Sequence, residues 1–363
     1  MADEWTVINH PDKTNINFFL MNTKRKIESL LYDINESGEF TSYTPDKLKA
    51  KITGLIFPHK AIKPKHDFLE ILEKFKSTRV TEGTRGVYNQ TKRKIEIFME
   101  EYKIQYLSLD DINREWLLEF DQWLSKTQKP NSRSIHLRNI RAVFNYAIDE
   151  ELTTNYPFRK FKIRQEPTKK RSLTVEKLRE LFNYEGEEFQ KKYIDIFKLM
   201  FFLVGINMVD LTQLKEITPE GRIEYIRAKT YRPYSIKVEP EAMEIINKYK
   251  GKNNLLDICD YYNDYRDYAH RMSIALQRLG PYTRKGRGGK KDVEELFPGL
   301  SPYWARHTWA TIAADLDIPD AIISQALGHA SGHSTTEIYI RRNPKKVDEA
   351  NRKVIDYVLY DKR

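Results

Sequence analysis

The chain has 363 residues, of which 40% are hydrophobic and 31% are charged; this length favours two or three domains, and this composition allows each of them a real core. The 62 Lys and Arg against 52 Asp and Glu give a formal net charge of +10, which favours polyanions such as nucleic acid as partners. One cysteine, Cys259, excludes an internal disulfide and a cysteine-based metal cluster. The longest apolar run, residues 194–205, is too short to span a bilayer. The opening residues MADEWTVINH carry no export signal, so we expect a cytoplasmic protein without membrane association.

Residues 1–62 look like a partial N-terminal module. The pattern predicts a helix over residues 15–31, a turn at residues 35–38 and a second helix that begins near Thr44 or Asp46. A basic stretch that contains prolines ends this module.

Residues 63–160 are predicted to form a bundle of four amphipathic helices, because apolar residues recur at helical spacing on four successive faces. The predicted core residues are Phe68, Ile71, Leu72 and Phe75; Tyr88, Ile95, Phe98 and Met99; Trp116, Leu117, Phe120 and Trp123; and Ile140, Val143, Phe144 and Ala147. Basic residues between these faces, Arg138 among them, predict that at least one outer surface is positive.

Residues 161–171 are interpreted as a basic linker. Seven of the thirteen residues from 159 to 171 are Lys or Arg, and the stretch contains Pro167 but no apolar periodicity. The basic residues are Arg159, Lys160, Lys162, Arg164, Lys169, Lys170 and Arg171. Two interpretations stay open: a solvated tether, or a strap that follows a phosphate backbone between two domains clamped around a duplex.

Residues 172–363 are predicted to form a third unit that contains a small sheet. A buried helix over residues 187–204 is stopped by Gly205. Period-two alternation over residues 223–229, returning through residues 235–238, predicts a β-hairpin. The expected fold class is therefore mainly α with a small β-hairpin or sheet (α+β).

A glycine-rich basic stretch, PYTRKGRGGKKD at residues 281–292, follows later in this unit. It lacks the strand-to-helix context of a phosphate-cradling motif. We interpret it as a mobile surface loop, with nonspecific contact to a nucleic-acid backbone as the alternative.

A phosphate-binding helix start is predicted at Ser301 and Pro302. A hydroxyl N-cap followed by proline at the first helical position is typical of a helix N-terminus. Tyr303 and Arg306 are three residues apart and share a face of this helix. The free N–H groups of a helix start favour an anion, and Arg306 adds a charged fork that suits two phosphate oxygens.

A short helix is predicted over residues 320–327, with Gly328 at its end and His329 just beyond it. Tyr339 follows ten residues after His329 and is one of 22 tyrosines. Taken alone, such a tyrosine would usually be a packing residue.

Three histidines, His307, His329 and His333, raise the alternative of a zinc site. Gly328 breaks the helix between them and no nearby acid completes a ligand set. We therefore expect no metal.

Taken together, these residues resemble the catalytic domain of the tyrosine recombinases, the family of phage integrases and conjugative-transposon integrases. The resemblance is carried, in chain order, by Gly205 with Asp210-Leu211, Lys229 on the hairpin, Arg306-His307-Thr308, Leu327-Gly328-His329 and Thr336-Glu337-Ile338-Tyr339. It covers about residues 66–357, since the helical bundle looks like the family's SAM-like core-binding domain. Residues 1–62 look like part of its arm-binding region, without the usual leading strands.

The resemblance implies a role for each matching residue. Tyr339 is the nucleophile that becomes attached to the DNA strand through a 3′-phosphotyrosyl bond, Arg306 an activating arginine, Lys229 the hairpin lysine and His329 the histidine before the nucleophile. A phenol that attacks a phosphodiester in line needs cations around the phosphate, and the leaving 5′ oxygen needs a proton, which Lys229 can supply. The exchange of one ester for another is isoenergetic, so no cofactor is expected.

Two positions depart from the family pattern. Asn207 stands where the family has an arginine, and Tyr303 stands where it has a histidine. The absence of one charged group from the phosphate would weaken transition-state stabilisation by about 2–4 kcal/mol unless another group replaces it. Three arginines could do so, and the sequence does not choose among Arg222, Arg227 and Arg271.

The last predicted helix begins at Asn343 and Pro344 and has an apolar stripe. The stripe consists of Val347, Ala350, Val354, Ile355 and Val358. It packs either on its own domain or on a neighbouring protomer.

The function that the resemblance implies is site-specific recombination, as integration, excision or inversion, through Holliday-junction strand exchange. The implied partners are double-stranded DNA, further copies of the chain in a homotetramer on that DNA, and accessory DNA-bending proteins. Two rivals stay open: a catalytically impaired DNA-binding regulator of the same fold, and a type IB topoisomerase-like enzyme that relaxes supercoiled DNA without a special site.

Overall fold

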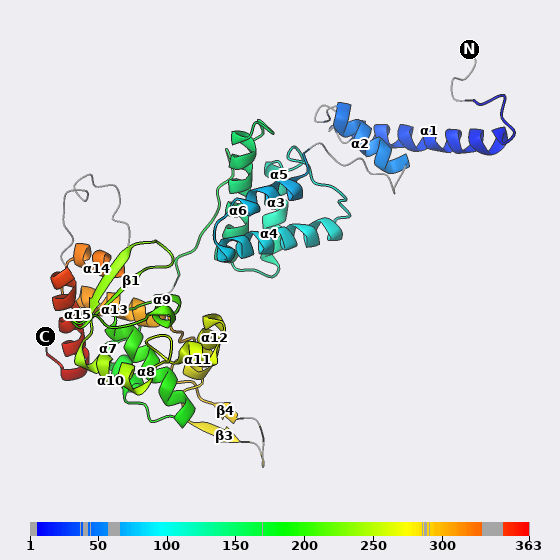
Figure 1. Cartoon of the computed structure of the whole chain (residues 1–363). Helices are drawn as coiled ribbons and strands as arrows, with labels where there is room; N and C mark the ends of the chain where they lie inside the picture. The colour runs from blue at the N-terminus through cyan, green and yellow to red at the C-terminus, as the bar shows by residue number, and fades with distance from the viewer. Residues whose placement is uncertain are drawn as a thin grey trace. The chain divides into compact units, whose positions relative to one another are not determined.

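The computed structural model describes residues 6–36, 38, 43, 45–56, 66–168, 170–284, 286, 289, 291–328 and 344–362. The chain divides into two units, Met1–Pro167 and Thr168–Arg363. Helices make up most of both, and the sheets of the described residues are two antiparallel pairs of short strands (Figure 1). The predicted fold class, mainly α with a small hairpin or sheet, is confirmed. No helix of the described residues is both long and apolar enough to cross a membrane.

The first unit opens with two helices that contact each other, α1 (Lys13–Glu36) and α2 (Pro45–Ile56). The helix predicted over residues 15–31 is present and extends further at both ends, through the first residues of the predicted turn. The second helix begins at Pro45, close to the predicted start, while Thr44 lies outside the described residues. Between residues 6 and 56 the described part of the chain contains no strand.

Four further helices form the predicted bundle, α3 (Phe68–Ser77), α4 (Glu82–Glu101), α5 (Arg114–Ser125) and α6 (Pro130–Asp149). Side chains of Asp67, Thr81 and Asn113 accept hydrogen bonds from backbone N–H groups at the starts of α3, α4 and α5, which satisfies donors that a helix start leaves free. The predicted apolar faces meet in one core. Trp123 is the exception, because it lies at the rim and donates to Glu101.

The basic segment after α6 is partly attached to this bundle. Phe158 is buried, and Phe161 and Ile163 pack against the bundle core, so apolar residues alternate with basic ones where no periodicity was expected. Asn131 at the start of α6 exchanges two hydrogen bonds with the backbone of Glu166, at 2.8 and 2.9 Å. The prediction of a segment without apolar periodicity is therefore wrong up to residue 163, because a period of two over so few residues is hard to see among so many charges.

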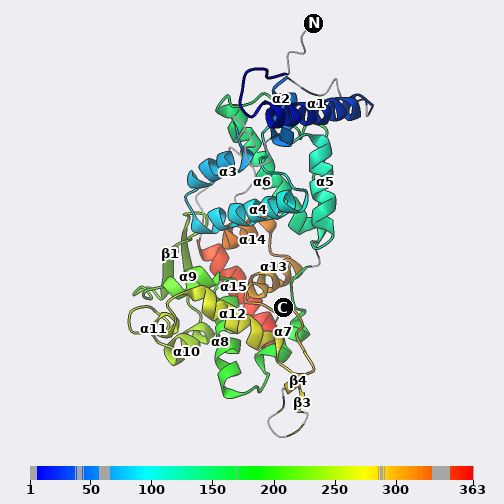
Figure 2. The ribbon, with the colours of Figure 1, turned by 90° about the vertical axis from the view of Figure 1, so that its right-hand side faces the viewer.

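The second unit is built around a central buried helix, α8 (Glu188–Phe202), which ends just before Gly205 as predicted. It contacts α7 (Val175–Phe182), α10 (Pro240–Lys248), α12 (Tyr265–Gln277) and α13 (Trp304–Asp315) (Figure 2). The remaining helices are α9 (Met208–Gln213), α11 (Ile258–Tyr261), α14 (Asp320–Leu327) and α15 (Pro344–Tyr360).

The predicted β-hairpin is present as β1 (Arg222–Ile226) and β2 (Pro233–Lys237), paired in antiparallel register with Tyr225 opposite Tyr234. A second pair, β3 (Tyr282–Arg284) and β4 (Lys291–Val293), occupies the ends of the glycine-rich stretch. The interpretation of residues 281–292 as a loop is thus wrong at both ends, because backbone pairing outweighs the low strand propensity of a basic sequence.

The helix that carries Arg306 begins later than predicted. Ser301 was expected as its N-cap, but α13 begins at Trp304. The backbone oxygens of Ser301 and Pro302 accept from the amides of Trp304 and Ala305 at 2.9 and 3.2 Å. A tighter turn of the 3₁₀ kind therefore precedes the α-helix, which is a common way for a helix to start.

The apolar stripe of α15 is buried within its own unit. Its five predicted residues are all buried, and α15 contacts α7, α13, α14 and β2. The Asn351 side chain accepts from Trp309 Nε1 at 2.9 Å and donates to the Phe202 carbonyl at 2.8 Å. Of the two alternatives for this helix, the structure shows packing on its own domain.

Candidate active site

Arg306 is held at the centre of the candidate site by two backbone carbonyls. Its side chain is only 6% exposed, and it donates to the Gly205 oxygen at 3.2 Å and to the Leu327 oxygen. Burial lowers the pKa of the Arg306 guanidinium, and the positive charge of Arg227 lowers it further, although an arginine stays charged at neutral pH.

Two glycines fit closely around this arrangement. Gly205 has a φ of +66°, and a Cβ there would lie 2.4 Å from the Arg306 Cα, so a side chain at this position would be strained and would collide with Arg306. Gly328 ends α14 with a φ of +58°, and a Cβ there would collide with the Tyr234 hydroxyl. The two carbonyls that hold Arg306 therefore lie at Gly205 and directly before Gly328.

The hairpin brings a second arginine to the same place. Arg227 follows β1, is 6% exposed, and donates from Nη1 to the Leu327 oxygen at 3.0 Å. Its Nη1 also lies 3.5 Å from the Tyr234 hydroxyl. Tyr234 stacks on Tyr225 with ring centroids 5.1 Å apart. Burial raises the pKa of Tyr225 well above its usual range, and the negative charge of Asp210 acts in the same direction.

The other two candidate arginines have different surroundings. Arg222 forms an ion pair with Asp348 of α15 at 2.7 Å. Arg271 on α12 lies over the ring of Tyr262. Of the three arginines that the sequence left open, Arg227 is the one that meets Arg306.

Lys229 lies in the exposed turn between the two strands. The backbone next to it is fixed, because Asp210 Oδ1 accepts from the Ala228 amide at 2.9 Å. Asn207 Nδ2 lies 3.5 Å from the other Asp210 oxygen. Asn207, which the sequence motifs matched to an arginine of the family, thus contacts the acid that anchors the hairpin turn.

Tyr303 and His307 lie next to each other at the start of α13. Tyr303 is 46% exposed, and its ring meets the His307 ring edge-on at 4.9 Å. Burial lowers the pKa of His307, and the positive charges of Arg171 and Arg306 lower it further. The Leu173 amide donates to Thr308 Oγ1 at 3.0 Å. The last basic residue of the linker therefore lies close to this end of α13.

Known proteins are similar to this chain in its helical bundle and in its fold. Residues 67–163 match the phage integrase SAM-like domain, which corresponds to α3–α6 and the start of the basic segment. No curated protein matches the sequence.

Several solved integrase structures are similar to the chain. A lambda integrase (75–356) dimer bound to a COC' core site has a TM-score of 0.55 and 13% identity, covering 76% of this chain and 97% of that one. A lambda integrase tetramer bound to a Holliday junction has a TM-score of 0.55 and 15% identity, covering 82% and 91%. The Tn1549 transposon integrase (aa 82–397) in complex with circular intermediate DNA has a TM-score of 0.52 and 15% identity, covering 79% and 99%.

The chain has a phage integrase SAM-like domain and the fold of the tyrosine recombinases. The resemblance that the sequence motifs predicted is thereby confirmed for the fold.

Five of the residues matched to tyrosine recombinase motifs fall outside the described part of the chain: His329, Thr336, Glu337, Ile338 and Tyr339. His329 and Tyr339 lie between Gly328, where α14 ends, and Pro344, where α15 begins. His333 of the zinc alternative also lies there, and the described residues contain no group of three His, Cys, Asp or Glu that could hold a metal.

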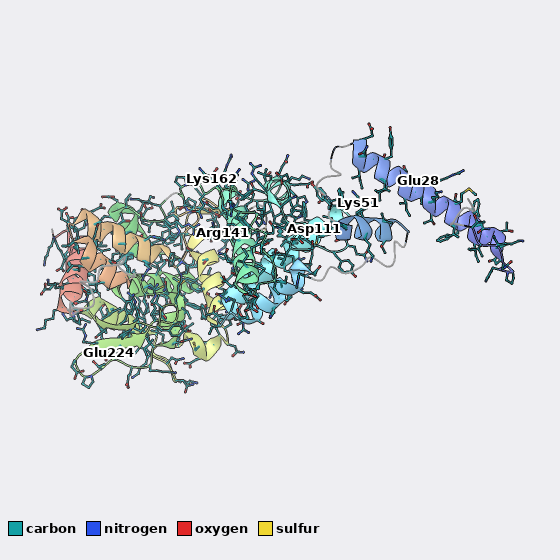
Figure 3. The ribbon with its side chains drawn as sticks, turned by 90° about the horizontal axis from the view of Figure 1, so that it is seen from above. Glu28, Lys51, Asp111, Arg141, Lys162 and Glu224 are labelled. Atoms are coloured by element: carbon teal, nitrogen blue, oxygen red, sulfur yellow. The ribbon has the colours of Figure 1, made fainter. Side chains whose placement is uncertain are left out.

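The residues predicted to contact DNA lie on the surface where the structure describes them. Those exposed are Arg138, Arg159, Lys160, Lys162, Arg164, Lys170 and Arg171, while Lys169 lies outside the described residues. Arg138 donates to the Ser134 backbone oxygen at 3.2 Å. Figure 3 labels Lys162 on the segment after α6 and Arg141, a further exposed arginine, on α6 itself.

Three features of the site were missed or left undecided from the sequence. Asp210 was matched to a motif but not to its bond with the hairpin, and the stacked pair of Tyr225 and Tyr234 was not predicted at all. Alternation did place Arg227 on the same face as Ile223 and Tyr225, which signals an inward position; Glu224 and Ile226 on the other face are exposed (Figure 3 labels Glu224).

Proposed function

We propose that this chain is a site-specific DNA recombinase that cuts and rejoins duplex DNA through a 3′-phosphotyrosyl bond to Tyr339. The observation that carries the proposal is the buried Arg306, which two carbonyls orient and which forms no ion pair with a carboxylate among the described residues. A fixed, unneutralised guanidinium in a region of low dielectric stabilises charge that develops on a phosphate.

The proposed reaction exchanges one phosphate ester for another. The Tyr339 oxygen bonds to phosphorus and loses its proton to water, while the bond from phosphorus to the 5′ oxygen breaks. Lys229, exposed at the hairpin turn, gives a proton to that leaving oxygen, and Arg306 with His329 offsets the charge on the non-bridging oxygens. Rejoining is the same exchange in reverse with a new 5′ hydroxyl, so the reaction needs neither a metal nor ATP.

The proposed substrate is double-stranded DNA. The exposed basic residues of the segment 159–171 and the formal net charge of +10 support contact with a phosphate backbone. We also propose that four copies act on two duplexes and exchange strands through a Holliday junction. A lambda integrase tetramer on a Holliday junction has the same fold, which supports this assembly.

Covalent capture tests the proposal. Purified chain is incubated with a library of random duplex fragments that carry nicks, so that a cleaved strand diffuses away and traps the protein on DNA. We expect a protein–DNA adduct that resists denaturants and is absent with Tyr339→Phe. Sequencing of the attached strands then gives the site and the polarity of cleavage. Wild-type chain that binds the fragments without an adduct would contradict the proposal.

A DNA-binding regulator without cleavage activity is the second candidate. Asn207 favours it, because no arginine occupies that position. The same capture experiment decides between the two functions, since a regulator binds the fragments and leaves no covalent product.

A further inference from the structure

We propose that Arg227 is the second guanidinium of the phosphate site and replaces the arginine that is absent at Asn207. The inference deepens the proposed function, since it assigns a further group to the same phosphate. It starts from the arrangement of two arginines that converge on one backbone oxygen.

The geometry singles out Arg227. The Leu327 oxygen accepts from Arg227 Nη1 and from Arg306 Nη2, so the two guanidinium groups lie side by side. Arg227 is 6% exposed, and its buried Nε has no hydrogen-bond partner among the described residues. A buried donor without a partner is uncommon and needs a physical reason.

The charges give that reason. No ion pair joins a carboxylate to Arg227 or Arg306 in the part of the chain that the structure describes. Asp210 is a buried acid whose negative charge raises the pKa of Tyr225. Its carboxylate accepts a hydrogen bond from the Ala228 amide. Two buried like charges around one acceptor are unfavourable until an anion arrives. A phosphodiester, with two non-bridging oxygens and one negative charge, fits two guanidinium forks.

The hairpin turn places Arg227 close to Lys229. Arg227 and Lys229 flank Ala228, whose amide is fixed by Asp210. The same short turn therefore presents a cation for a non-bridging oxygen and, under the proposed function, the proton donor for the leaving oxygen. Asn207 Nδ2 lies 3.5 Å from an oxygen of the same Asp210.

A binding measurement tests Arg227 without any need for catalysis. Inorganic phosphate is titrated against wild-type chain, Arg227→Gln and the matched control Arg222→Gln, with the melting temperature as readout. We expect phosphate to raise the Tm of the wild type and of Arg222→Gln but to have little effect on Arg227→Gln. In buffer without phosphate, Arg227→Gln should melt no lower than the wild type, because one of two repelling charges is gone.

An arginine with a purely structural role predicts the reverse. Arg227→Gln would then melt lower than the wild type in phosphate-free buffer and would keep the full phosphate shift. That pair of results would overturn the inference. Arg222→Gln should lower the Tm in either case, because Asp348 is left without its ion-pair partner.

The second measurement uses a nicked duplex that carries the captured cleavage site. We expect Arg227→Gln to form the covalent adduct about 10²- to 10³-fold more slowly than the wild type. A duplex with a neutral methylphosphonate at the scissile position lacks one negative charge that the guanidinium groups would offset. The ratio of the wild-type adduct rate to the Arg227→Gln rate should therefore shrink to less than about tenfold. Equal adduct rates on the phosphodiester would refute the role of Arg227 and leave the proposed function standing. Absence of any wild-type adduct would refute the proposed function. The phosphate titration would still test whether Arg227 binds phosphate.

Discussion

The two units hold their positive charges in opposite ways. In the first unit the basic residues of the segment 159–164 are exposed and alternate with apolar residues that pack on the bundle. In the second unit Arg306 and Arg227 are buried and share one backbone acceptor. Exposed charges are screened by salt and tolerate substitution, whereas buried charges keep their full effect and a fixed direction. Under the proposed function, the exposed charges would set the affinity for duplex DNA and the buried arginines would orient one phosphate.

Replacing a buried cation should give the largest effect. Arg306→Gln removes a fixed guanidinium from the phosphate, and we expect covalent adduct formation to slow about 10²- to 10³-fold in single-turnover assays. The exposed counterpart, Lys162→Gln, should change the same rate less than about threefold at low salt. Equal decreases in the two variants would erase the distinction between the units.

The close fit around Arg306 predicts a decrease in stability on substitution. Gly205→Ala places a Cβ 2.4 Å from the Arg306 Cα and requires a φ of +66°, so the free energy of unfolding should fall by about 2–5 kcal/mol. Gly221→Ala is the matched control, since it has a φ of +72° with no atom within 4 Å. The control should fall by only about 1–2 kcal/mol in urea denaturation. A Gly205→Ala value no larger than that would show that the contact is loose.

The exposed charges should influence binding and its dependence on salt. The double variant Lys160→Gln, Lys162→Gln should bind duplex DNA more weakly, and the slope of log K against log salt should become less negative by about 0.9 for each phosphate that the variant no longer neutralises. Adduct formation at saturating DNA should be unchanged. A control with Lys103→Gln and Lys126→Gln removes the same charge elsewhere on the first unit. If both pairs shift the slope equally, the basic segment has no special part in binding.

The smallest effect concerns a buried histidine of the bundle. Burial lowers the pKa of His136, whose Nδ1 lies 3.0 Å from Thr91 Oγ1. The unfolded chain therefore takes up this proton at a higher pH than the folded chain does. The contribution of neutral His136 to the free energy of unfolding is fully present above about pH 6.5. It falls as the pH drops below this value, by at most about 1.4 kcal/mol per pH unit. His136→Gln should flatten the dependence of the urea-unfolding free energy on pH between about pH 7 and pH 5.

The sequence predicted the parts of the molecule that depend on local pattern. Helical spacing predicted the bundle and the central helix, alternation predicted the hairpin, and Gly328 was placed correctly at a helix end. Errors occurred where local signals compete, as at Ser301, where a tighter turn precedes the helix, and at residues 281–292, where pairing between strands prevails.

The arrangement of the site depends on contacts that local patterns do not contain. The choice among three arginines rests on the Leu327 oxygen, which is 100 residues from Arg227 in the chain. Likewise, the part that Asp210 plays at the hairpin is set by a bond to an amide 18 residues away. Such contacts follow from how helices and strands pack, and spacing along the sequence does not encode them.

Mass spectrometry of the captured adduct tests the central claim most directly. After nuclease and protease digestion of the wild-type complex, we expect a nucleotide attached through a 3′ phosphate to the peptide that contains Tyr339, and the fragment spectrum should place it on that tyrosine. A nucleotide on another residue, or cleaved DNA without any attached peptide, would contradict the claim that buried arginines present a phosphate to Tyr339.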